Sequence, residues 1–120
     1  MTIIGISVII LEKEKKMETE QFETILEERL VKIETVLGNK AREYAQDDNR
    51  LHNFKVAAQM LNVTPAQALW GMAAKHLVSV SDLVNGKLKA TPAMVDEKIG
   101  DLCNYLILLE AVLREGENHA

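Results

Sequence analysis

The 120-residue chain has few cysteines, few aromatic residues and no long apolar run. Its single cysteine, Cys103, cannot form an internal disulfide, so we expect a small core residue in a reducing compartment, the cytoplasm. Aromatic residues make up only 4% of the chain, which predicts an aliphatic core with methionine as filler. The apolar run TIIGISVIIL at residues 2–11 is far shorter than the ~20 residues of a membrane-spanning helix. No Lys or Arg precedes it, so it is also a poor signal peptide.

Acidic residues outnumber basic ones, 18 to 14. The formal net charge is −4, and there is neither a basic stripe nor an aromatic platform, which argues against a nucleic acid polymer as the main partner. The sequence has no Walker-type loop, GxGxxG, HExxH or CxxC motif. Its serines do not form a Ser/His/Asp order, which disfavours hydrolysis by a nucleophilic side chain. Metal-assisted hydrolysis stays open.

The apolar spacing predicts an all-α protein, a small bundle of about four helices. Residues 19–37 predict an amphipathic helix that Gly38 ends or kinks. Residues 53–61 predict a short helix whose inward side chains are Phe54, Ala57, Ala58 and Leu61. Longer helices are expected at 64–85 and 91–116. Short connections favour antiparallel packing of these helices. We therefore expect a helical domain at residues 17–116 and a tail at 117–120.

Residues 1–16 form an N-terminal extension of a different character. The β-branched run from Ile3 to Ile10 is typical of a strand, but a helical chain offers it no partner strand. It is either a short strand paired across an oligomer, a disordered arm, or an artefact of an upstream start codon with Met17 as the natural start.

The segment 91–116 is expected to be the central helix. Thr91 is a good N-cap, Pro92 suits the first helical position, and Gly116 is a good stop. Apolar residues cover most of its circumference, which is typical of a buried helix. Glu97, Asp101 and Asn104 share a wedge of roughly 60°, which places two carboxylates and an amide at the edge of the core. Such groups need a metal ion, a Lys or Arg, or water, or they are ordinary capping and ion-pair residues.

The helix at 64–85 begins with a capping-box pattern, Thr64-Pro65-Ala66-Gln67, and Gly86 is expected to end it. His76 lies on its apolar side. A histidine there is either a satisfied core residue or a ligand. The inward face is predicted to hold Leu69, Ala73, Leu77 and Val80.

Before this helix lies the polar stretch 39–54, the longest predicted loop, with a single helical turn possible at residues 41–44. Polar loops on helical scaffolds often carry binding groups.

Short motifs in this loop and the later helices resemble the nucleotide modification associated domain family. They are KAREY at 40–44, NFK at 53–55, KH at 75–76 and DEKIGDLCNY at 96–105. The resemblance covers roughly residues 20–115. That family is found largely in bacteriophages and prophages, and its name implies nucleotide metabolism or DNA modification. The resemblance therefore implies a protein that works in the cytoplasm of a host cell.

Ile99-Gly100-Asp101 followed by Tyr105-Leu106 also resembles a helix of the all-α nucleoside triphosphate pyrophosphohydrolases. Those enzymes hold magnesium with a Glu-x-x-Glu pair and a Glu-x-x-Asp pair. This chain departs from both patterns. Lys98 replaces the Glu of the second pair, and Glu27 and Glu28 do not form the first. A lysine beside Asp101 favours an ion pair or a phosphate contact.

Three hypotheses follow, all with homo-oligomerisation expected. The first is a phage-type protein that binds a nucleotide or other phosphorylated small molecule without a cofactor, in nucleotide metabolism, DNA modification or sequestration of a nucleotide signal. The second is a Mg-dependent hydrolase, with Glu97 and Asp101 as metal ligands beside Glu43 and Asp82. The third is a structural or regulatory helical homo-oligomer without a ligand. The candidate nucleotide-binding residues are Lys40, Arg42, Glu43, Tyr44, Asn53, Lys75, His76, Lys98, Asp101, Asn104 and Tyr105.

Overall fold

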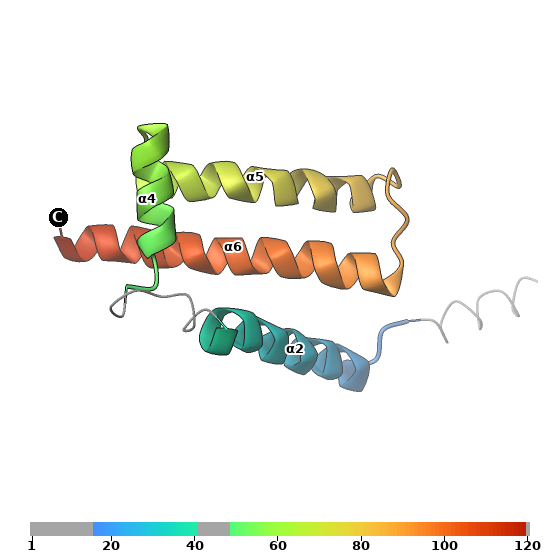
Figure 1. Ribbon diagram of the computed structural model, residues 1–120. Coiled ribbons are helices and arrows are strands. Elements are labelled where there is room, and N and C mark those ends of the chain that lie inside the picture. The colour runs from blue at the N-terminus through green and yellow to red at the C-terminus, as the bar shows by residue number, and fades with distance from the viewer. Residues whose placement is uncertain (1–15, 41–48, 120) are drawn as a thin grey trace, which may run out of the picture. The chain divides into compact units, whose positions relative to one another are not determined.

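The computed structural model describes residues 16–40 and 49–119, and these residues are helical with short connections (Figure 1). They contain no strand, which confirms the all-α prediction. The predicted strand at 3–10 and the predicted helical turn at 41–44 lie outside the described residues. The contacts within the chain divide it into two compact units, Met1–Leu30 and Val31–Ala120. The helices are α2 Thr19–Ile33, the π-helix η1 Glu34–Lys40, α4 His52–Leu61, α5 Pro65–Val84 and α6 Pro92–His119.

Helix α2 has the predicted amphipathic sequence but contains no buried residue. The large apolar side chains of its face, among them Phe22 and Leu26, are each about half exposed. The α-helical geometry ends at Ile33, and the helix continues as the wider π-helix η1. Gly38 lies inside η1 and does not end the helix. Arg50 donates to the carbonyl oxygens of Leu37 and Gly38, which satisfies acceptors that a helix end leaves free.

Helix α4 ends where Asn62 adopts a left-handed backbone with φ 57°. Asparagine tolerates this conformation better than most residues, and it lets the Val63 N–H donate to the carbonyl of Ala58 at 3.0 Å. Ala58 faces inward as predicted and is 1% exposed. Leu61 was also predicted to face inward, but it is 63% exposed. The chain turns away immediately after it, so the last turn of α4 has little cover.

The start of α5 confirms the capping-box prediction. The Gln67 N–H donates to Thr64 Oγ1 at 3.1 Å, and the Thr64 N–H donates to Gln67 Oε1 at 2.9 Å. The helix ends at Val84, and Gly86 follows with φ 76°, a left-handed conformation that glycine adopts without strain. The predicted end of this helix is therefore also correct to within one residue.

Helix α6 begins as predicted but ends later. The Met94 N–H donates to Thr91 Oγ1 at 3.2 Å, so Thr91 is the cap. The prediction that Gly116 stops the helix is wrong, because α6 continues to His119. Glycine permits a left-handed stop but does not impose one, and Gly86 is the only glycine with positive φ among the described residues.

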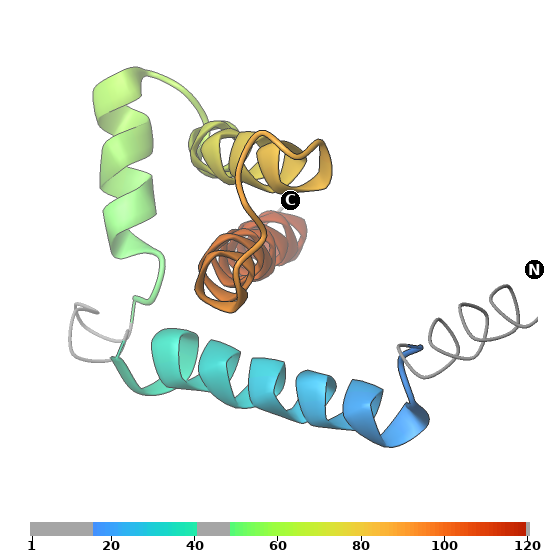
Figure 2. The same cartoon turned by 90° about the vertical axis from the view of Figure 1, so that its right-hand side faces the viewer.

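Helices α5 and α6 lie side by side, and α4 crosses the first turns of α5 (Figures 1 and 2). Lys55 of α4 also forms an ion pair with Glu115 of α6, with a 2.5 Å distance between Nζ and Oε1. The buried apolar residues among the described ones gather on α4, on α5 and just before α4. They are Leu51, Ala58, Ala68, Leu69 and Ala73.

Helix α6 is less central than predicted. Leu106, Ile107 and Leu113 are 44%, 43% and 54% exposed, and the core residue expected at Cys103 is only partly buried. Periodicity had indicated an apolar circumference, but it does not tell how many neighbours the helix has. The flank of α6 toward α5 is the covered one.

Candidate functional site

A cluster of polar and aromatic side chains lies at the seam between α5 and α6. The imidazole of His76 stacks on the ring of Tyr105, with ring centroids 4.6 Å apart and an interplanar angle of 24°. The Oδ2 atom of Asp101 lies 3.7 Å from Nδ1 of His76. Asp101 and Tyr105 are four residues apart on α6, so they share one face of that helix. We call His76, Asp101, Asn104 and Tyr105 the His76–Tyr105 cluster.

The cluster is partly open to solvent. The His76 side chain is 20% exposed and that of Asp101 is 43% exposed. At 3.7 Å the two groups attract strongly only when the imidazole carries a proton, and solvent screens the attraction. The stacking on Tyr105 fixes the imidazole plane. The cluster can therefore present an oriented imidazole N–H to an anion.

Asn104 contributes an acceptor that lacks a donor. Its Oδ1 atom is buried and has no hydrogen-bond partner among the described residues. A buried acceptor without a partner costs about 1–3 kcal/mol. Native structures contain few such atoms, and each marks either strain or a group that meets another molecule. Because Asn104 lies three residues after Asp101, it stands at the edge of the same face of α6.

The two carboxylates predicted at the core edge are more exposed than expected. The side chain of Glu97 is 58% exposed and lies 3.7 Å from Lys98 Nζ. Asp101 instead approaches His76. Helix periodicity places these side chains on one face of α6, but it does not tell how much of that face the neighbouring helix covers. Lys98 shares the face of Asp101 and Tyr105, at spacings of three and seven residues, and places a cation on that side.

Lys75 and His76 adjoin in sequence but occupy different surroundings. His76 faces α6, whereas Lys75 lines an open groove of about 420 Å³ between α4 and α5. The groove is otherwise mainly apolar, and its other lining residues are Leu61, Val63, Gln67, Ala68, Gly71 and Met72. Asn53, another candidate residue, is exposed on the first turn of α4.

The structure does not place the candidate residues of the predicted loop beside the His76–Tyr105 cluster. Arg42, Glu43 and Tyr44 lie outside the described residues, and only the backbone of Lys40 is described, at the end of η1. Within residues 16–40 and 49–119, no three His, Cys, Asp or Glu side chains are grouped so that they could hold a metal ion. The two carboxylates predicted to bind a metal together have different neighbours: Glu97 lies beside Lys98, and Asp101 lies beside His76.

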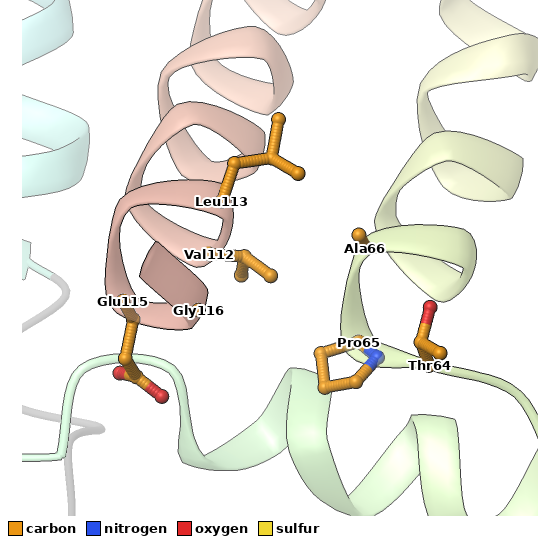
Figure 3. Close-up of a pocket in the computed structure, with 7 residues that line it drawn as sticks. All are labelled: Thr64, Pro65, Ala66, Val112, Leu113, Glu115 and Gly116. Carbon is orange, nitrogen blue, oxygen red and sulfur yellow. The ribbon is translucent and has the colours of Figure 1, made fainter. Parts of the chain in front are cut away.

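A second cavity lies between the start of α5 and the end of α6 (Figure 3). It measures about 330 Å³, and Val112 and Pro65 are turned toward one another across it. Sequence analysis missed it, because Thr64 and Pro65 were assigned to a cap and Gly116 to a stop. Nothing in the spacing of these residues links the two helix ends. The remaining lining residues are Ala66, Leu113 and Glu115.

Comparisons with protein-family models, with curated proteins and with solved structures give no match for this chain. Among the described residues, no helix is both long enough and apolar enough to cross a membrane. The features that bear on function are therefore the side chains of the α5–α6 seam and the motifs in the sequence.

Proposed function

We propose that the protein binds a nucleotide, or a closely related phosphorylated small molecule, at the His76–Tyr105 cluster. The observation that carries the proposal is the convergence of His76 and Tyr105 from two helices into one stack, with Asp101 at 3.7 Å from the imidazole. An oriented imidazole, an aromatic ring, a carboxylate and an amide are the groups that a nucleotide site uses.

Each group of the cluster has a distinct role in this proposal. The imidazole N–H of His76 and the ammonium group of Lys98 bind phosphate oxygens, since hydrogen bonds to a charged phosphate are short and strong. Asp101 accepts hydrogen bonds from the sugar hydroxyls and holds His76. The Asn104 amide contacts the base or sugar, and the aromatic surface of Tyr105 packs against the base.

The resemblance to the phage family supports a role in bacteriophage nucleotide metabolism, DNA modification or sequestration of a nucleotide signal, in the cytoplasm of the host cell. We favour binding without turnover. The chain lacks the paired Glu-x-x-Glu and Glu-x-x-Asp patterns of the pyrophosphohydrolases, and Lys98 brings a positive charge to the place of a metal-ligating carboxylate.

A thermal-shift screen tests the proposal. The full chain is heated with AMP, ADP, ATP, GTP, CTP, UTP, cyclic dinucleotides and inorganic phosphate, each with and without MgCl₂. A ligand at 100 times its dissociation constant stabilises the folded state by about 2.7 kcal/mol, a shift of several degrees for a domain of this size. We expect such a shift with at least one nucleotide, with the nucleotide recovered intact.

The matched variants His76→Ala and His52→Ala locate the effect. His52 begins α4 and takes no part in the cluster, so His52→Ala should keep the shift that His76→Ala loses. No shift with any nucleotide contradicts the proposal. If the thermal shift requires magnesium and the nucleotide is recovered as a hydrolysis product, the protein is a hydrolase. In that case Asp101→Asn should abolish turnover.

A further inference from the structure

Helix α5 carries a second apolar face besides the one that packs in the core. Trp70, Leu77 and Val84 are 55%, 39% and 79% exposed and recur every seven residues. Ala74 and Ser81, also exposed, lie between them at spacings of four and three. We call these five residues the outer stripe of α5. At about 100° per residue, the centre of the stripe lies about 80° around the helix from the buried side chains Leu69 and Ala73, so the stripe flanks the core face.

The outer stripe has the pattern of a helix–helix seam. Large side chains occupy one position of the seven-residue repeat and small ones the other, which is the spacing of a coiled-coil seam. The stripe contains no charged residue. Lys75 and Asp82, which belong to the same helix, fall on the side of α5 away from it. Val78, 61% exposed, extends the apolar surface at its flank.

We infer that a second copy of this chain packs on the outer stripe of α5. A two-fold interface needs a patch that is complementary to itself, and an apolar stripe without charged residues satisfies this condition because no like charges meet across the axis. Leu77 is the middle residue of the stripe, so it meets Leu77 of the second copy near the two-fold axis. In an antiparallel pair Trp70 then lies against Val84.

The size of the surface fits a small specific interface. From Trp70 to Val84 the stripe runs about 21 Å at 1.5 Å per residue. With a tryptophan at one end and Val78 beside it, pairing two copies buries on the order of 1,000 Å² in total, the lower limit for a specific interface. The inference is independent of the nucleotide site, because His76 faces α6 and not the stripe.

Charge pairing at Leu77 tests the inference. The full chain, Leu77→Glu and Leu77→Lys are compared by analytical ultracentrifugation from 1 to 200 µM. We expect a dimer for the unmodified chain and a monomer for each variant, because like charges then face each other at the axis. An equimolar mixture of the two variants should restore the dimer, since opposite charges then meet. Val56→Glu is the matched control, at 38% exposure against 39% for Leu77, and should leave the dimer intact.

A second variant guards against a folding defect at Leu77. Val84 is 79% exposed, so Val84→Glu should weaken the dimer at least tenfold without lowering the melting temperature of the monomer. A monomeric unmodified chain overturns the inference, as does a dimer that survives both Leu77→Glu and Val84→Glu. A monomer in which Val84→Glu lowers the melting temperature shows that a part of the same copy covers the stripe, and it also overturns the inference.

Discussion

The imidazole of His76 lies on the phenol ring of Tyr105, with the ring centroids 4.6 Å apart. This contact joins α5 to α6 at the point where Asp101 and Asn104 also project from α6. The histidine contributes two things to this contact, a flat aromatic surface and ring nitrogen atoms that can form hydrogen bonds. Substitutions that keep one and remove the other distinguish a packing residue from a binding residue.

His76→Phe keeps the stack on Tyr105 and removes the ring nitrogen atoms. We expect a free energy of unfolding within about 1 kcal/mol of the original, because a volume-conserving change is well tolerated. Nucleotide affinity should fall about 10- to 100-fold, since a hydrogen bond to a charged group contributes about 1.5–3 kcal/mol. Urea unfolding and calorimetric titration with ATP measure the two quantities. Unchanged ATP affinity would remove His76 from the site.

Asn104→Leu should stabilise the protein. It removes a buried acceptor without a partner and leaves an apolar group of similar size, so the free energy of unfolding should rise by about 1 kcal/mol. Asn85→Leu is the control, because the Asn85 side chain donates to the Ser81 carbonyl at 2.9 Å, and its loss should destabilise. If Asn104→Leu destabilises instead, the amide makes a contact within the protein that our account lacks.

Leu69 is 0% exposed and is the largest fully buried side chain among the described residues. Leu69→Ala removes three carbon atoms from the core and leaves a cavity, so we expect a loss of about 2–5 kcal/mol. Met60→Ala, at a position 82% exposed, should change stability by less than about 0.5 kcal/mol. Chemical denaturation measures the free energy of unfolding of both variants. Equal losses would contradict the assignment of Leu69 to the core.

The same substitution should have opposite effects at two threonines. Thr64→Ala removes the cap of α5 and should cost about 0.5–2 kcal/mol. Thr24 lies inside α2, where its hydroxyl donates to the carbonyl of Glu20 and alanine has the higher helix propensity, so Thr24→Ala should be neutral or stabilising. The melting temperatures of the two variants, measured by thermal unfolding, test both expectations. A Thr64→Ala variant with unchanged stability would show that the capping box contributes little.

The sequence predicted local features well. The start of α5 and the start of α6 depend on contacts three residues apart, at Thr64 and Thr91, and the residue types alone specify these contacts. The stop at Gly116 failed because glycine allows a left-handed turn without requiring it. The exposure of α6 was mispredicted because the number of neighbouring helices is a tertiary property.

The candidate site shows the same limit. Sequence analysis singled out His76, Asp101, Asn104 and Tyr105 one by one, from helix periodicity and from the resemblance. Their contact depends on the register between α5 and α6, which no local spacing encodes. For the same reason the sequence grouped Lys75 with His76, although the structure places Lys75 in a groove toward α4.

A two-dimensional ¹H–¹⁵N NMR titration of the full chain with ATP tests directly whether a nucleotide binds at the α5–α6 seam. We expect saturable shifts concentrated on the amides of His76, Lys98, Asp101, Asn104 and Tyr105, with much smaller changes in α4. Inorganic phosphate should shift the His76 and Lys98 signals but leave Tyr105 nearly unchanged. Saturable shifts confined to other parts of the chain, or no shift at millimolar ATP, would contradict binding at this seam.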